Sequence, residues 1–171
     1  RSLQSALELA HYGRKHRGAI FVVALGFGLE VNAFLLDFKL AEAFGLKVVV
    51  VVERRDEGVR LLESAVQEGV AFDLVDGGID EVQVYRAVGH ALAQNAVPVV
   101  LMPAGQKTRV PLAVKMMAGG LADSLRAKRL FVVVPKTAMP QFDQLRPHLT
   151  QPEVDELADT SDSELWRFIA A

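Results

Sequence analysis

Hydrophobic residues gather along the chain in five short runs that lack a regular alternation with polar residues. These runs cover residues 20–25, 47–53, 70–75, 97–102 and 130–134, and most of them are rich in valine. A strand that is apolar on successive residues is typical of a parallel sheet covered on both faces. The pattern therefore predicts five strands buried inside such a sheet.

Segments with the apolar spacing of helices separate these runs. The first begins at a capping box, Ser5 with Glu8, and ends near Arg14, and the others cover residues 29–44, 56–67, 80–94 and 110–127. Gly45 and Gly69 follow two of these segments, as glycine often follows a helix. The alternation predicts one α/β domain over residues 1–171. We expect a three-layer αβα sandwich with right-handed crossovers and a mostly parallel sheet of about five strands.

Two more capping boxes lie near the end of the sequence, Thr150 with Glu153 and Ser161 with Glu164. The second opens the stretch "TSDSELWRFIAA", which has the pattern of an amphipathic helix with apolar residues available for packing: Leu165, Trp166 and Ile169. This helix is a candidate lead into a further domain. The chain also begins at Arg1 and not at methionine, which suggests a trimmed or processed piece.

The composition excludes several classes of function. With 51% apolar and 23% charged residues the chain is globular, and a net charge of -2 predicts neither nucleic-acid nor membrane binding. The absence of cysteine excludes disulfides and thiolate chemistry. No two of the four histidines have the spacing of a helical metal pair, so we predict no metal site. The apolar runs are too short to span a bilayer, and no signal-peptide pattern is present, so a cytoplasmic protein is expected.

In a parallel α/β sheet, ligands bind at the carboxyl ends of the strands. The first strand runs into "GFGLEV", which holds Gly26 and Gly28 of a dinucleotide fingerprint but Val31 at its third glycine position. The second strand ends in Glu53, which is followed by Arg54. An acid at this place could bind a ribose hydroxyl of NAD, and an arginine could bind the 2′-phosphate of NADP. An NAD(P)-binding Rossmann-like module is therefore one hypothesis. A solvated turn at the head of a helix is the other interpretation of the Glu53 segment.

The stretch "HYGRKHRGAIFVVALGFGLE" resembles the opening of the amino-acid kinase fold, as used in acetylglutamate kinase and acetylglutamate synthase. "LLDFKLAEAFGLKVVVVVERR", "GHALAQNAVPVVLMP" and "ADSLRAKRLFVVVP" are similar to later units of that family. The resemblance spreads over nearly the whole chain and lies mostly in apolar spacing. The resemblance implies an α/β domain related to arginine biosynthesis. Compared with the family, the chain is shorter in the middle: the stretch "VDGGIDEVQVYRAVGHAL" joins two family segments and omits the segments between them that cover the substrate.

The positions that carry chemistry in that family are replaced in this chain. The strand-end lysine falls on Ala24, the second glycine of the pair on Phe27, and the His-Gly-Gly-Gly turn on residues 52–55. The family's aspartate on the long helix falls on Lys115. Phosphoryl transfer needs cations and donors aimed at the moving phosphoryl group, so these changes predict a domain without kinase activity. A small-molecule kinase for acylamino acids with a rearranged active site remains a further hypothesis.

In acetylglutamate synthase the kinase-like domain is non-catalytic, senses arginine and builds the oligomer, while an acetyltransferase domain does the chemistry. The resemblance thus implies a role in assembly or amino-acid sensing, with an acetyltransferase domain or partner nearby. It also implies a homo-oligomer through the N-terminal helix, with Leu3, Leu7 and Tyr12 at the interface. A helix folded back on its own sheet is the alternative for these residues.

The candidate ligand-binding residues are the two glycines, the charged residues at strand ends and one lysine on the long helix: Gly26, Gly28, Glu53, Arg54, Asp76 and Lys115. Lys115 is expected to contact an anion or to pair with Asp76 or Glu53, and a surface lysine with a buried stem is the alternative. We predict no catalytic residue, no cofactor and no metal.

Overall fold

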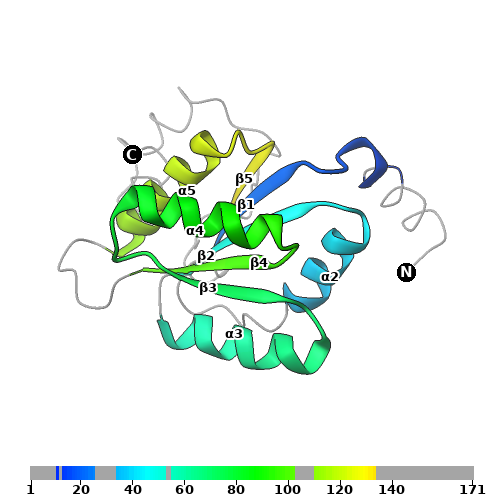
Figure 1. The fold of residues 1–171 in the computed structure, drawn as a ribbon, viewed down its shortest axis with the longest axis horizontal. Coiled ribbons are helices and arrows are strands. Elements are labelled where there is room, and N and C mark those ends of the chain that lie inside the picture. The colour runs from blue at the N-terminus through cyan, green and yellow to red at the C-terminus, as the bar shows by residue number, and fades with distance from the viewer. Residues whose placement is uncertain (1–10, 12, 26–33, 53–54, 103–109, 134–171) are drawn as a thin grey trace, which may run out of the picture.

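The computed structural model describes residues 11, 13–25, 34–52, 55–102 and 110–133 of the chain. In these residues it contains one sheet of five strands: β1 (Ile20–Leu25), β2 (Lys47–Val52), β3 (Phe72–Asp76), β4 (Val97–Leu101) and β5 (Arg129–Val133). Every strand pairs with its neighbours in parallel, in the order β3-β4-β2-β1-β5 (Figure 1). The predicted α/β fold with about five parallel strands is confirmed.

Four helices connect these strands: α2 (Leu35–Ala43), α3 (Arg55–Glu68), α4 (Glu81–Ala93) and α5 (Val110–Ser124). Residues 11 and 13–15 are also helical, in the region of the predicted first helix. After α2 and α3 the chain turns at Gly45 and Gly69, both at φ +71°, and after α4 it turns at Asn95, at φ 55°. Such left-handed residues end helices because they turn the backbone out of the helical path.

The valine strand β2 explains why the molecule has three layers. Side chains alternate across a strand, so Val49 and Val51 point to one face of the sheet, and Val48, Val50 and Val52 point to the other. The first pair packs with residues of α4 and α5, and the second set packs with residues of α2 and α3. Two hydrophobic cores therefore lie on either side of one sheet, as the run of buried valines predicts.

The helices are distributed over the two faces in chain order. The connections from β1 to β2 and from β2 to β3 use α2 and α3, and the connections back to β4 and β5 use α4 and α5. Crossovers that run toward one edge of the sheet and crossovers that run toward the other edge must use opposite faces if all of them have the same handedness. At their carboxyl ends, β2 sends the chain to one face and its neighbour β4 sends it to the other.

None of the helices in the described part of the chain is long and apolar enough to cross a membrane.

Candidate functional site

The carboxyl ends of β2 and β4 form the topological switch point of the sheet. In open α/β sheets, neighbouring strands whose connections leave to opposite faces open a crevice that receives ligands. Here Val52 ends β2, and its carbonyl accepts a hydrogen bond from the amide of Met102, just past β4, at 3.2 Å. Helix α3 begins at Arg55 and helix α5 at Val110. Two helix N-termini, each with a partial positive charge, therefore flank this edge from opposite faces.

Four of the predicted ligand-binding residues, Gly26, Gly28, Glu53 and Arg54, lie outside the described residues. The structure fixes only the strand ends that precede them. Leu25 at the end of β1 pairs in register with Val52 at the end of β2, so the two predicted turns follow neighbouring strands.

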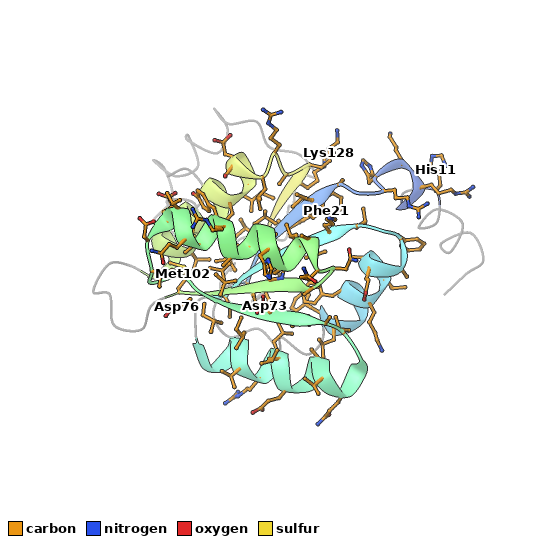
Figure 2. The ribbon with its side chains drawn as sticks, in the orientation of Figure 1. His11, Phe21, Asp73, Asp76, Met102 and Lys128 are labelled. Carbon is orange, nitrogen blue, oxygen red and sulfur yellow. The ribbon has the colours of Figure 1, made fainter. Side chains whose placement is uncertain are left out.

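Asp76 ends β3 and begins a tight turn beside β4. Its exposed carboxylate accepts a hydrogen bond from the amide of Gly78 at 2.9 Å. The amide of Gly77 donates to the carbonyl of Leu101 at 2.7 Å, which ties the turn to the end of β4. Figure 2 shows Asp76 near Met102 at this end of the sheet. Asp76 therefore shapes the turn by an Asx-type contact and presents a negative charge at the carboxyl edge.

Strand order decides which of the predicted residues share a site. Asp76 is the last residue of β3, and Glu53 comes directly after β2 in the sequence. Strand β4 lies between these two strands. Adjacent strands are about 4.8 Å apart, so the ends of β3 and β2 are separated by roughly 10 Å. The end of β3, which carries Asp76, and the end of β2 thus lie on opposite flanks of β4.

Lys115 is on α5, and its side chain lies outside the described part of the structure. Helix α5 packs on β1, β2 and β5, whereas α4, on the same face of the sheet, packs on β3 and β4. Val114 and Ala118, on either side of Lys115 in sequence, are buried in the core. The helix that carries Lys115 therefore packs on β2, whereas the helix that packs on the strand of Asp76 from this face is α4.

Two positions that sequence analysis compared with polar positions of the amino-acid kinase family, Ala24 and Val52, are core positions in this structure. Ala24 is 1% exposed and belongs to the core beneath α4 and α5, and Val52 is fully buried in the core beneath α2 and α3. A lysine in place of Ala24 would put an ammonium group among valines and alanines, where desolvation strongly disfavours the charge.

Sequence analysis missed a close approach between α4 and α5 at the side chain of Tyr85. The hydroxyl of Tyr85 donates a hydrogen bond to the carboxylate of Glu81, one turn earlier on α4. A Cβ added at Gly120 of α5 would lie 2.5 Å from that hydroxyl, so the absence of a side chain at Gly120 lets Tyr85 pack there. The neighbouring Gly119 has open space, so only one residue of the pair serves close packing. Tyr85 and Gly120 are far apart in the sequence, and no local pattern connects them.

The environment of Tyr85 keeps its hydroxyl protonated. Burial, the hydrogen bond to Glu81 and the negative charges of Glu81 and Asp123 raise the pKa of Tyr85 to about 12. At neutral pH this hydroxyl is therefore a donor in a packing contact and is poorly suited to be a general base.

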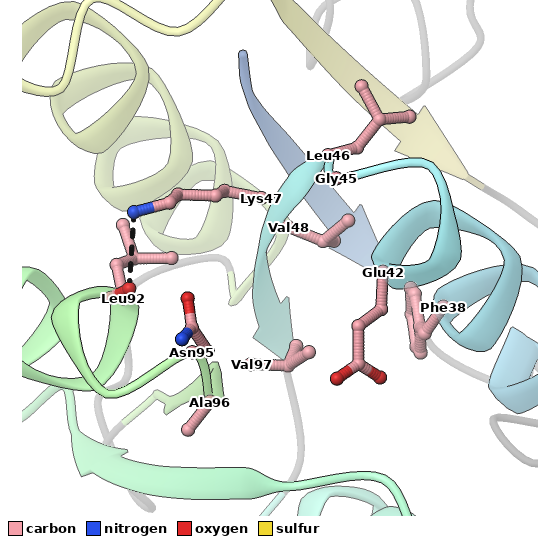
Figure 3. A pocket seen from close by; sticks show the side chains of 10 residues that line it. All are labelled: Phe38, Glu42, Gly45, Leu46, Lys47, Val48, Leu92, Asn95, Ala96 and Val97. Atoms are coloured by element: carbon pink, nitrogen blue, oxygen red, sulfur yellow. Dashed lines mark hydrogen bonds between the residues drawn. The ribbon is translucent and has the colours of Figure 1, made fainter. Parts of the chain in front are cut away.

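A pocket of about 270 Å³ lies at the opposite, amino edge of the sheet, and sequence analysis did not anticipate it. Figure 3 shows Glu42 at the end of α2, Lys47 at the start of β2 and Asn95 after α4 around apolar walls. The ammonium of Lys47 donates a hydrogen bond to the carbonyl of Leu92 at 3.3 Å, in the last turn of α4. A cation at the negative end of a helix dipole stabilises that helix, so Lys47 has a structural function here.

In the described ranges, no group of three or more histidine, aspartate or glutamate residues could hold a metal ion. No model of a known protein family matches the chain, and no curated protein sequence matches it either.

Proposed function

We propose that this chain is a non-catalytic domain that binds a small anionic ligand, such as an amino acid, at the crevice between the carboxyl ends of β2 and β4. The observation that carries the proposal is the strand order, which puts the switch point of the sheet between these two strands. The N-termini of α3 and α5 flank it and favour a carboxylate or phosphate group. The sequence that joins β4 to α5 adds two cations, Lys107 and Arg109.

The burial of Ala24 and Val52 supports the non-catalytic part of the proposal. A kinase of the resembled family needs a lysine and a histidine at these two positions, and both are now apolar core positions. The proposal accordingly keeps the resemblance to the non-catalytic domain of acetylglutamate synthase, with a role in amino-acid sensing or in assembly. Assembly through Leu3, Leu7 and Tyr12, which lie outside the described residues, and an acetyltransferase domain or partner are parts of the same proposal.

Strand order gives the NAD(P) hypothesis no comparable support. In the dinucleotide-binding order the glycine turn after the first strand lies at the switch point itself. Here β1 and β2 both send the chain to the face covered by α2 and α3, so the turn after β1 lies one strand away from the switch.

Backbone NMR titration locates the ligand. The 171-residue chain is titrated separately with L-arginine, N-acetylglutamate, ATP and NAD. We expect saturable shifts for one of the two amino-acid ligands at the amides of Val52, Gly77 and Met102, and none at Glu42 or Asn95 beside the opposite pocket. Shifts confined to the amino edge, or saturable shifts with NAD alone, would overturn the proposal.

A pair of variants tests the predicted anion contact. Lys107→Ala should weaken binding by roughly tenfold or more, because a hydrogen bond to a charged group is worth about 1.5–3 kcal/mol. Arg60→Ala removes an exposed cation from the middle of α3 and should leave affinity unchanged. Equal affinities for the two variants would argue against a cationic contact at this edge.

Phosphoryl transfer is tested with ATP and N-acetylglutamate. We expect no product above the background without protein. Turnover that Lys115→Ala abolishes would contradict the non-catalytic part of the proposal and leave the ligand site standing.

The assembly part is tested by light scattering, where the double change Leu3→Ser and Leu7→Ser should lower the molar mass. An unchanged mass would reject that interface.

A further inference from the structure

Strand β5 exposes large apolar side chains that its sequence would lead one to expect in a core. Leu130, Phe131 and Val132 are 40%, 43% and 37% exposed, whereas Val49–Val52 of β2 are fully buried. β5 is an edge strand, and β1 is its only partner among the described strands. These three residues are called here the β5 apolar surface.

The β5 apolar surface wraps around the edge of the sheet. The register pairs Val132 with Ala24, which places Val132 on the face that α5 covers. Phe131 pairs with Val23 and so lies on the opposite face, where its ring meets that of Phe21 edge-on at 5.7 Å between centroids. Among the described helices, only α5 packs extensively on β5, and it does so from the other side. Apolar area near an aromatic pair therefore faces outward at one edge of the molecule.

Basic residues adjoin this surface at the amino end of β5. Lys128 and Arg129 lead into the strand, and the amide of Lys128 donates to the carbonyl of Ile20 at 2.8 Å, which holds the start of β5 beside the start of β1. Lys15 lies just before β1. Burial and the positive charges of Lys15, Lys128 and Arg129 lower the pKa of His16, so these three cations act on the same region. Figure 2 shows Lys128 near Phe21 at this end of the sheet. Lys15, Lys128 and Arg129 are called here the basic cluster.

We propose that the β5 apolar surface and the basic cluster together form a docking site for residues 153–166 of the same chain. The sequence of this segment, "EVDELADTSDSELW", holds six carboxylates and no lysine or arginine. Its large apolar residues are Val154, Leu157, Leu165 and Trp166. An acidic segment with apolar side chains complements an apolar surface bordered by cations, and charge complementarity of this kind sets which partner binds.

The length of the chain allows this docking. Residues 134–152 join the end of β5 to the acidic segment, and 19 extended residues reach at most roughly 60 Å. Strand β5 has five residues and spans only about 17 Å. A tethered segment acts at an effective concentration of about millimolar, which favours it over a second molecule at ordinary protein concentrations. The docking site lies at the β5 edge, away from the switch between β2 and β4, and does not rest on the proposed function.

Trp166 makes the proposal measurable, because it is the only tryptophan of the chain. In the 171-residue protein we expect blue-shifted emission and protection from acrylamide quenching, both independent of protein concentration. Phe131→Ser should shift the emission to the red and remove the protection. Val82→Ser changes an apolar residue that is 61% exposed on α4 and should alter neither property. Far-ultraviolet circular dichroism confirms that each variant is folded.

A charge swap tests the electrostatic half. The double change Lys128→Glu and Arg129→Glu should expose Trp166, and adding Asp155→Lys with Glu156→Lys should restore its protection. The matched change Arg60→Glu with Arg86→Glu should have no effect. Emission that neither Phe131→Ser nor the swap alters would overturn the proposal. Protection that appears only as concentration rises would also overturn it, and would assign the surface to contacts between copies of the chain.

Discussion

Gly77 lies where the turn after β3 meets the end of β4, and it has no room for a side chain. A Cβ at this position would come within 2.7 Å of the carbonyl oxygen of Leu101, a backbone atom fixed by the sheet. Gly77→Ala should therefore lower the free energy of unfolding by about 1–3 kcal/mol, as overpacking of a rigid site does. Urea denaturation followed by circular dichroism measures this loss.

Gly89 is the matched control for Gly77. It is an exposed glycine inside α4, and a Cβ added there meets nothing within 4 Å. Gly89→Ala should raise the free energy of unfolding by up to about 1 kcal/mol, because alanine is the better helix former. If both substitutions changed the free energy of unfolding in the same direction, the contact with the carbonyl of Leu101 would not be the reason that position 77 requires glycine.

Tyr85 gives the fold an alkaline sensitivity. Its pKa is raised from 10.0 to about 12 in the folded protein, so folding favours the protonated phenol. The resulting stabilisation is fully present below pH 10 and is lost as the pH rises from 10 to about 12. Between these values the free energy of unfolding should fall more steeply for the unmodified protein than for Tyr85→Phe. Urea denaturation at stepped pH tests this, with Tyr12→Phe as the control. Parallel curves for the unmodified protein and Tyr85→Phe would contradict it.

At the scale of the elements, helix ends carry information that single residues do not. Helix α4 ends in a left-handed residue, Asn95 at φ 55°, where α2 and α3 end in glycine. Asn95→Ala should cost about 1–2 kcal/mol, because alanine keeps the Cβ that is strained in this conformation but lacks the polar group through which asparagine forms compensating local hydrogen bonds. Asn95→Gly should be neutral or stabilising. Thermal unfolding of both variants tests this prediction. An equal loss of stability in the two variants would show that Asn95 acts through its side chain and not through its backbone conformation.

The elements were predictable from the sequence because their signals are local. The apolar run of β1 gave both of its ends, and the glycines at positions 45 and 69 marked the ends of two helices. The other strands were placed within two residues. Both ends of α3 and of α4 were predicted within one residue. The first residue of α5 matches the prediction, and its last residue differs by three. Helix α2 begins at Leu35, whereas its predicted start at residue 29 lies outside the described residues. Helix ends are predicted less well than helix centres because terminal turns carry weak signals.

Strand order and the site were less accessible from the sequence. The spacing of apolar residues does not indicate that β4 lies between β2 and β3. This position of β4 defines the switch point and separates Asp76 from the end of β2. The run of β5 is as apolar as that of β2, yet it lies at the edge and is exposed. The packing of Tyr85 at Gly120 and the hydrogen bond from Lys47 to Leu92 join elements far apart in the chain.

At the scale of the whole molecule, the centre of the sheet differs from its two edges. β2 lies between β1 and β4, and from Val48 onward its side chains are buried on both faces. β5 pairs with β1 across a long stretch of sequence, with Phe21 opposite Arg129, and its residues are mostly exposed. The central strands can open only when both cores open, whereas β5, together with the segment proposed to dock on it, can separate from β1 while most of both cores stays closed.

Native-state hydrogen exchange should therefore divide the sheet into two classes. We expect the amides of β2 and β4 to exchange only through global unfolding. Their free energy of exchange should therefore decrease with added denaturant as steeply as the free energy of unfolding does. The amides of β5 should exchange faster, through a local opening that denaturant scarcely affects. Phe131→Ser should speed exchange in β5 and leave β2 unchanged relative to global stability. If β5 exchanged as slowly and as steeply as β2, its edge would open only together with the two cores, and a separable β5 edge would be excluded.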